Sequence, residues 1–149
     1  QRGLGTPDGA REVVRDWLAS RYGDIGRAAV IDNGSGLSRD ARVSALLLAR
    51  LLQDAAASPV MPELMASLPV TGVDGTLRRA KALPGRAHLK TGSLRDVTAV
   101  AGYVLAPSGR RYVMVGVVNH PNAGAARPAL EALIQWTAND GYAEGEALK

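Results

Sequence analysis

The sequence of 149 residues contains no cysteine and no phenylalanine. Without cysteine the chain has no disulfide, no thiolate metal site and no cysteine nucleophile. Two tryptophans and four tyrosines are its only large aromatic residues, so we expect an aliphatic core. No apolar stretch reaches the ~20 residues of a membrane-spanning helix. No signal peptide is visible, and none is expected if Gln1 is internal to a longer precursor.

Charge of either sign is moderate and dispersed. The chain carries 18 basic and 14 acidic residues, a net charge of +4, and most of the basic residues are arginine. Surfaces that bind nucleic acid cluster basic residues with stacking aromatics, whereas the pairs Arg78-Arg79 and Arg110-Arg111 are isolated. We therefore expect no nucleic-acid partner, although a modest positive surface suits an anionic polymer such as a cell-wall glycan-peptide.

Composition and periodicity predict one domain over residues 1–149 that contains both helices and strands, α/β in the broad sense and α+β in the narrower one. With 46% apolar and 21% charged residues, the chain has the composition of an ordinary globular protein. Apolar spacing and capping residues predict helices over residues 6–23, 44–57, 62–68, 77–83 and 126–139, with a loose tail at 140–149. Strands are predicted at 87–91, 97–105 and 112–119. Their short connections require antiparallel pairing, and their nearly continuous apolar runs predict helices on both faces.

Two segments carry residues suited to chemistry. Lys90-Thr91-Gly92, followed by Ser93, places a cation, a hydroxyl and a residue without a side chain together on an apolar strand. This pattern is typical of a strand edge that binds a carboxylate, and we call residues 90–93 the carboxylate-binding ledge. A strand lysine, however, is more often an edge residue that discourages aggregation. Upstream, Ser38-Arg39-Asp40 ends a glycine-rich loop that begins at Asp32. The alternative interpretation of Ser38 is an ordinary loop or cap serine.

Other catalytic arrangements are not supported by the sequence. No Gly-x-Ser-x-Gly elbow accompanies His88 or His120, so a Ser-His-Asp triad is not expected. Two histidines without cysteine do not make a zinc motif, and no phosphate-binding glycine loop is present. We expect no metal and no cofactor.

Taken together and in this order, these segments resemble the penicillin-binding serine peptidases, specifically the D-alanyl-D-alanine carboxypeptidase/endopeptidase family that includes penicillin-binding protein 4. Asp74-Gly75-Thr76-Leu77-Arg78-Arg79 matches the family too, but we assign it only a turn and a helix cap. The resemblance implies a β-lactamase/transpeptidase-like fold, no cofactor, and a bacterial, exported, periplasmic protein. Its partners would be peptidoglycan stem peptides and β-lactams.

The resemblance also implies roles for individual residues. Lys90 would supply positive potential to the catalytic hydroxyls, and Thr91 would help to bind the terminal carboxylate of the substrate. Gly92 would let the substrate backbone approach the strand edge, and the N–H of Ser93 would donate to the oxyanion. Ser38 would relay a proton to the leaving amine. Asp40 stands where the family has Asn, so its equivalence is open, because an ionised Asp cannot donate a hydrogen bond.

The nucleophile of that family, a Ser-x-x-Lys element, is missing. The residues three positions before the three lysines are Arg78, Ala87 and Glu146. We therefore expect residues 1–149 to be the C-terminal portion of a penicillin-binding domain whose nucleophile lies outside this chain. The predicted function is that of a serine-type D-Ala-D-Ala carboxypeptidase/endopeptidase. The alternatives are a noncatalytic peptidoglycan-peptide binding module and a β-lactamase-like hydrolase, and the oligomeric state is left open.

Overall fold

The computed structural model describes residues 5–80 and 84–140. The chain divides into two compact units, residues 1–51 and 52–149, and each is described by itself. Helix α2 (Ala45–Ala56) crosses the boundary in sequence between them. Within the described residues, no helix combines the length and the apolar character needed to cross a membrane.

The first unit is built on helix α1 (Pro7–Arg27). Its predicted start is confirmed, because Thr6 Oγ1 accepts a hydrogen bond from Gly9 N at 3.1 Å. Gly23, with φ of 58°, interrupts the helical backbone where the first helix was expected to end, and a further helical turn follows. The start of α2 is also confirmed, since Leu47 N donates to Ser44 Oγ at 3.1 Å. The core of this unit contains Leu18, Ala29 and Leu47.

A three-stranded antiparallel sheet forms the centre of the second unit, in the order β1 (Ala87–Leu94), β2 (Val97–Leu105), β3 (Arg111–Asn119). The predicted strand positions and pairing are confirmed, but β1 is longer than predicted. It continues through Gly92 and Ser93 to Leu94, and a tight turn with Asp96 at φ of 66° leads into β2. The whole segment from Lys90 to Ser93 is therefore strand.

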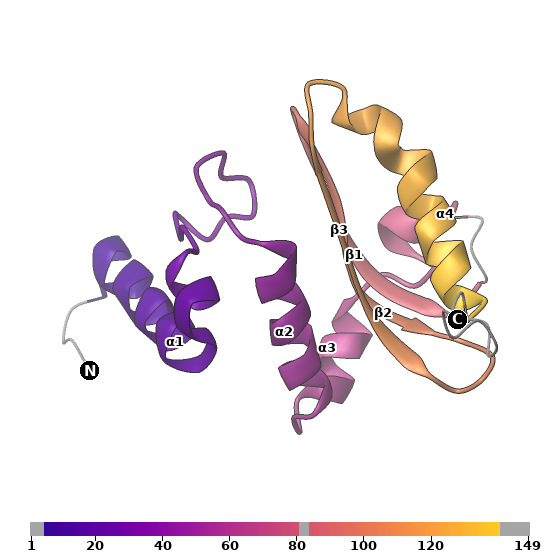
Figure 1. Ribbon diagram of the computed structural model, residues 1–149, viewed down its shortest axis with the longest axis horizontal. Coiled ribbons are helices and arrows are strands. Elements are labelled where there is room, and N and C mark those ends of the chain that lie inside the picture. Colours follow the sequence, from indigo (N-terminus) through magenta and orange to yellow (C-terminus); the bar gives the residue numbers. More distant parts are fainter. Residues whose placement is uncertain (1–4, 81–83, 141–149) are drawn as a thin grey trace, which may run out of the picture. The chain divides into compact units, whose positions relative to one another are not determined.

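Both faces of this sheet are covered within the second unit (Figure 1). Helix α4 (Arg127–Ala138), preceded by the short 3₁₀ helix η2 (Ala123–Ala126), packs on one face through Ile134 and Ala138. On the other face, Tyr103 Oη donates to Leu52 O at 2.7 Å, and His88 Nδ1 lies 3.2 Å from Met65 O in α3 (Met61–Ser67). This arrangement confirms the predicted α+β class.

The segment between α3 and the sheet differs from prediction. Residues 77–83 were expected to be helical, but the described part contains only the 3₁₀ helix η1 (Gly75–Leu77) and a turn to residue 80, and residues 81–83 lie outside the described residues. Leu77 is buried in the core with Leu89, so packing fixes this segment without a long helix.

The predicted loose tail is anchored at its first residue. Asp140 accepts hydrogen bonds from Ser108 N at 3.2 Å, Ser108 Oγ at 2.9 Å and Tyr112 Oη at 3.0 Å. These bonds hold the end of α4 against the β2–β3 turn. Residues 141–149 lie outside the described residues.

Candidate active site

Among the residues that the structure describes, the first half of the outer edge of β1 is covered by another segment and the second half is open. Leu89 N donates to Pro69 O at 2.9 Å, and Thr71 N donates to Ala87 O at 3.0 Å, so residues 69–71 cover the start of the edge. In an antiparallel strand, alternate residues direct their backbone groups to the same edge. Thr91 and Ser93 therefore continue the series of Ala87 and Leu89, with their N–H groups directed outward beyond the end of the covering segment.

Lys90 lies next to this open edge. Its side chain is exposed, and Nζ donates to Thr91 O at 2.5 Å. By strand alternation Lys90 projects on the same face as His88, opposite to Thr91. The ammonium group is thus held beside a carbonyl of the open edge, and no carboxylate of the described residues pairs with it.

No neighbour within residues 5–80 and 84–140 gives Gly92 a steric reason to be glycine. A Cβ added there would meet only Ala99 Cβ, at an ordinary contact distance of 3.7 Å, and its φ is not positive. Gly102 on β2, by contrast, is required by close approach to His88 O. A glycine that packing does not require, on an open strand edge, fits a surface that a ligand backbone approaches closely.

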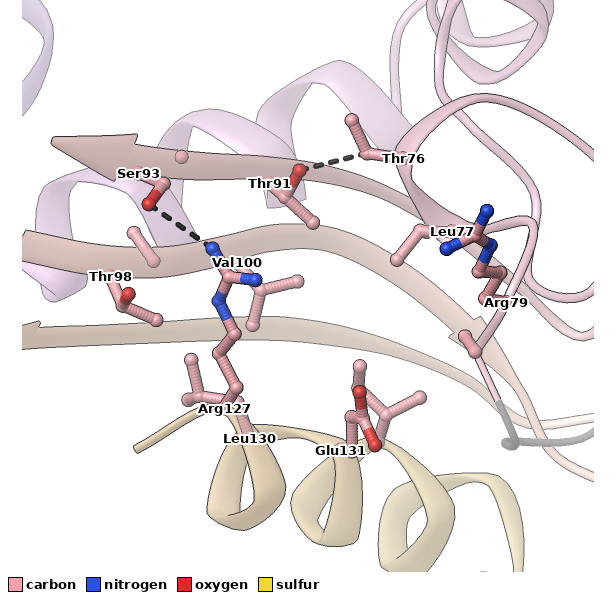
Figure 2. A pocket seen from close by; sticks show the side chains of 14 residues that line it. Thr76, Leu77, Arg79, Thr91, Ser93, Thr98, Val100, Arg127, Leu130 and Glu131 are labelled. Carbon is pink, nitrogen blue, oxygen red and sulfur yellow. Dashed lines mark hydrogen bonds between the residues drawn. The ribbon is translucent and has the colours of Figure 1, made fainter. Parts of the chain in front are cut away.

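Thr91 and Ser93 face a cavity of about 470 Å³ on the α4 side of the sheet. Figure 2 shows Arg127 extending from the start of α4 toward Ser93, and its Nη2 donates to Ser93 Oγ at 3.5 Å. Thr91 Oγ1 donates to Thr76 Oγ1 at 2.8 Å. Arg79, which the sequence placed only in a turn and helix-cap segment, also lines the cavity. Three further lining side chains were not singled out by the sequence, where they look like ordinary surface or strand residues: Thr98, Arg127 and Glu131.

Ser38 and Asp40 belong to the first unit, in a loop closed by backbone bonds between Val30 and Arg42. Ser38 Oγ accepts from the N–H groups of Asp40 and Ala41, both at 3.1 Å. These are the contacts of a turn serine. The structure thus brings Lys90, Thr91, Gly92 and Ser93 together on one strand, and the catalytic roles of Ser38 and Asp40 stay predictions.

Metal chemistry finds no support in the described part of the chain. No group of three or more histidine, aspartate or glutamate side chains is placed there to hold an ion. His88 is half-buried against the Met65 carbonyl, which fits a structural role.

Comparison with known proteins identifies the family. Residues 2–140 match the D-Ala-D-Ala carboxypeptidase 3 (S13) family. A D-alanyl-D-alanine carboxypeptidase of Actinomadura sp. (strain R39) is 35% identical over 140 residues, covering 89% of this chain and 26% of the relative. Carboxypeptidase DacB of Mycolicibacterium smegmatis is 36% identical over 143 residues, covering 87% of this chain and 30% of the relative.

Solved structures agree with this assignment. Penicillin-binding protein 4 of Haemophilus influenzae superposes with a TM-score of 0.60 at 26% identity, over 72% of this chain and 28% of that one. A predatory endopeptidase of Bdellovibrio bacteriovorus shares the fold with a TM-score of 0.74 at 17% identity, over 87% of this chain and 37% of that one. The chain spans less than a third of the length of its curated relatives. It belongs to the D-Ala-D-Ala carboxypeptidase 3 (S13) family of serine peptidases.

Proposed function

We propose that the complete protein is a serine-type D-Ala-D-Ala carboxypeptidase/endopeptidase that cleaves peptidoglycan stem peptides through an acyl-enzyme. The nucleophile would lie outside this chain, because none of the lysines follows a serine at the required spacing. The observation that carries the proposal is the open edge of β1, where Lys90, Thr91, Gly92 and Ser93 stand together in a chain of this family.

The edge suits an extended peptide that adds as a strand. Its outward N–H groups would bind the substrate backbone, as in β-strand addition. The hydroxyl of Thr91 would bind the terminal carboxylate, and the ammonium of Lys90 would raise the local positive potential. In the acylation step the serine oxygen forms a bond to the penultimate D-alanyl carbonyl carbon, the C–N bond breaks, and a proton passes to the leaving amine. The Ser93 N–H would stabilise the oxyanion formed in between.

β-lactams belong to the same proposal. Penicillin-binding protein 4 of Haemophilus influenzae has been crystallised in complex with a β-lactam. A β-lactam carries a carboxylate near its reactive carbonyl, so it would use the same ledge as the stem peptide. A periplasmic location, where stem peptides are exposed, is part of the proposal.

The test is the intact mass of the complete gene product after exposure to benzylpenicillin, together with release of D-alanine from a peptide ending in D-Ala-D-Ala. We expect one penicilloyl adduct per protein and D-alanine release that benzylpenicillin abolishes. Binding of stem peptides without adduct or D-alanine release would instead indicate a noncatalytic binding module. Rapid penicillin turnover without an accumulating adduct would indicate a β-lactamase-like hydrolase.

A further inference from the structure

The hydroxyl of Thr76 is the one hydrogen-bond partner of the Thr91 hydroxyl in the described part of the chain. Thr91 Oγ1 donates to Thr76 Oγ1 at 2.8 Å, across 15 residues of sequence. The contact is visible in Figure 2, where Thr76 reaches the ledge from the segment that precedes the sheet. A turn and a cap, the roles predicted for this segment, do not account for a bond to the ledge.

The position of Thr76 is fixed by three of its neighbours in sequence, each through a different contact. Asp74 Oδ1 accepts from Val70 N at 2.7 Å, which closes the loop that carries Thr76. Gly75 adopts φ of 51° and lies so close to Pro69 that an added Cβ would be 3.2 Å from the proline ring. Leu77 is 5% exposed and packs with Leu89 of β1. The segment is therefore fixed to the same strand that carries Thr91.

The chemistry of two adjacent hydroxyls makes this contact useful to a carboxylate site. A hydroxyl has one proton and two acceptor lone pairs, and it rotates to suit its partners. In the free protein Thr91 donates to Thr76. A carboxylate can only accept, so Thr91 must turn its proton toward it, and its oxygen then needs a donor. Thr76 can supply that donor by reversing the bond, and the hydroxyl chain strengthens the outer bond cooperatively.

We propose that Thr76 is a positioning residue for substrate recognition, which orients the Thr91 hydroxyl and donates to it when Thr91 binds the carboxylate of a peptide or β-lactam. This inference rests on the proposed function of the ledge. It gives the Asp74-Gly75-Thr76 segment a role in specificity: the segment carries the second hydroxyl of a two-hydroxyl relay.

The experiment compares acylation of the complete gene product by benzylpenicillin and by its methyl ester, which lacks the carboxylate charge. For Thr76→Val, which keeps the shape and removes the hydroxyl, the rate with benzylpenicillin should fall roughly fivefold, as expected for one neutral hydrogen bond. The rate with the methyl ester should change less than twofold. Thr76→Ser should restore the wild-type ratio of the two rates.

Thr98→Val is the matched control. Thr98 lines the same cavity, and its buried Oγ1 has no hydrogen-bond partner within the described residues. Its replacement should leave the ratio of the two acylation rates at the wild-type value. A general disturbance of the cavity would affect Thr98→Val and Thr76→Val alike.

Thr91→Val and the double variant Thr76→Val/Thr91→Val complete the set. If Thr76 acts through Thr91, the double variant should be no slower than Thr91→Val alone. Normal benzylpenicillin acylation by Thr91→Val would overturn the proposed role of the ledge itself. A slow Thr91→Val with a normal Thr76→Val, equal losses with both acyl donors, or no rescue by serine would overturn only the inference about Thr76.

Discussion

At the residue scale, strand alternation sorts the ledge residues between two faces of one strand. Lys90 projects on the His88 face, whereas Thr91 and Ser93 project toward α4 and direct their backbone groups to the open edge. A ligand lying along that edge would meet a cation from one face and hydroxyls from the other. The same four residues in a loop would lack this fixed separation.

Lys90→Ala should therefore affect chemistry more than folding. We expect the acylation rate of the complete gene product to fall by about 10²- to 10³-fold, the usual loss for one well-placed electrostatic group. The free energy of unfolding should change by only about 0.5 kcal/mol, because the side chain is exposed. Stopped-flow acylation and urea unfolding measure the two effects.

Lys90→Arg is the control, because it keeps an edge cation of different shape. If Lys90 only discourages aggregation, Lys90→Ala would aggregate more readily yet acylate within twofold of the wild-type rate, and Lys90→Arg would be normal in both respects. That result would contradict a role of Lys90 in acylation and would support the interpretation that it only discourages aggregation.

Ser38 and Ser35 form a matched pair for testing the upstream loop. Each hydroxyl accepts backbone N–H groups of the following residues, Ser38 from Asp40 and Ser35 from Leu37 at 3.1 Å. If Ser38 relays a proton, Ser38→Ala should lower turnover by roughly 10²- to 10⁴-fold. Ser35→Ala should cost only the stability of a turn hydrogen bond, about 1 kcal/mol.

Asp40 separates the remaining possibilities in the same assay. If it replaces the family's Asn as an acceptor, Asp40→Asn should keep most of the activity and Asp40→Ala should not. Normal turnover of Ser38→Ala would assign Ser38 to the turn alone. The second element would then have to be Ser35 or a residue outside this chain, which contains no Ser-x-Asn.

At the element scale, β1 shows why a strand boundary was predicted wrongly. Gly92 and Ser93 are residues typical of turns, so the pattern favoured an end at Thr91. Pairing with β2 continues to Leu94 opposite Val97, because the turn consists only of Arg95 and Asp96. Local propensity was outweighed by cross-strand pairing, which a single sequence does not display.

Gly102 allows β2 to pack closely against the part of β1 that precedes the ledge. It pairs with Leu89, has φ of +150°, and an added Cβ would lie 2.2 Å from His88 O. Gly102→Ala should therefore destabilise the protein by about 1–3 kcal/mol, the usual cost of backbone strain. Gly116→Ala on β3 should cost less, because its nearest obstacle is the movable Leu130 side chain at 2.7 Å. Equal urea midpoints for the two variants would contradict this account.

The end of α4 gives a prediction for acid pH. The hydrogen bond from Ser108, followed by that from Tyr112, lowers the pKa of Asp140 below its ordinary value of 3.8. A carboxyl group whose pKa is lower in the folded than in the unfolded state stabilises the fold above pH 3.8, and loses this contribution as the pH falls through the folded pKa.

Asp140→Asn should therefore be less stable than wild type at pH 7, and the difference should shrink below about pH 4. Thermal unfolding of both proteins across this range measures it. Ser108→Ala should reduce the same difference at neutral pH. A gap between wild type and Asp140→Asn that is constant with pH would show that the ionised carboxylate does not hold the end of α4.

At the scale of the whole molecule, the fold class and family were predictable because they depend on long-range order of motifs and strong strand patterns. The residues around the ledge were less predictable. Thr76 precedes the sheet in the sequence and Arg127 follows it, yet both contact residues of the ledge. No periodicity of the sequence marks either residue.

Periodicity also predicted an apolar stripe on α1, yet Val13 and Trp17 are 57% and 48% exposed. A pattern reports an apolar face but not whether this chain covers it.

The 149-residue chain by itself should form no stable adduct with a penicillin. Acyl transfer requires nucleophile, base and oxyanion donors in one cleft. The chain holds no Ser-x-x-Lys and spans 26% and 30% of the two curated relatives described above. Incubation with a fluorescent penicillin, followed by denaturing electrophoresis, should label the complete gene product stoichiometrically and leave the isolated chain unlabelled. Unfolded chain in the same assay controls for nonspecific reaction of surface groups. A stoichiometric label on the folded chain that Ser38→Ala removes would contradict the prediction, because it would make Ser38 the nucleophile.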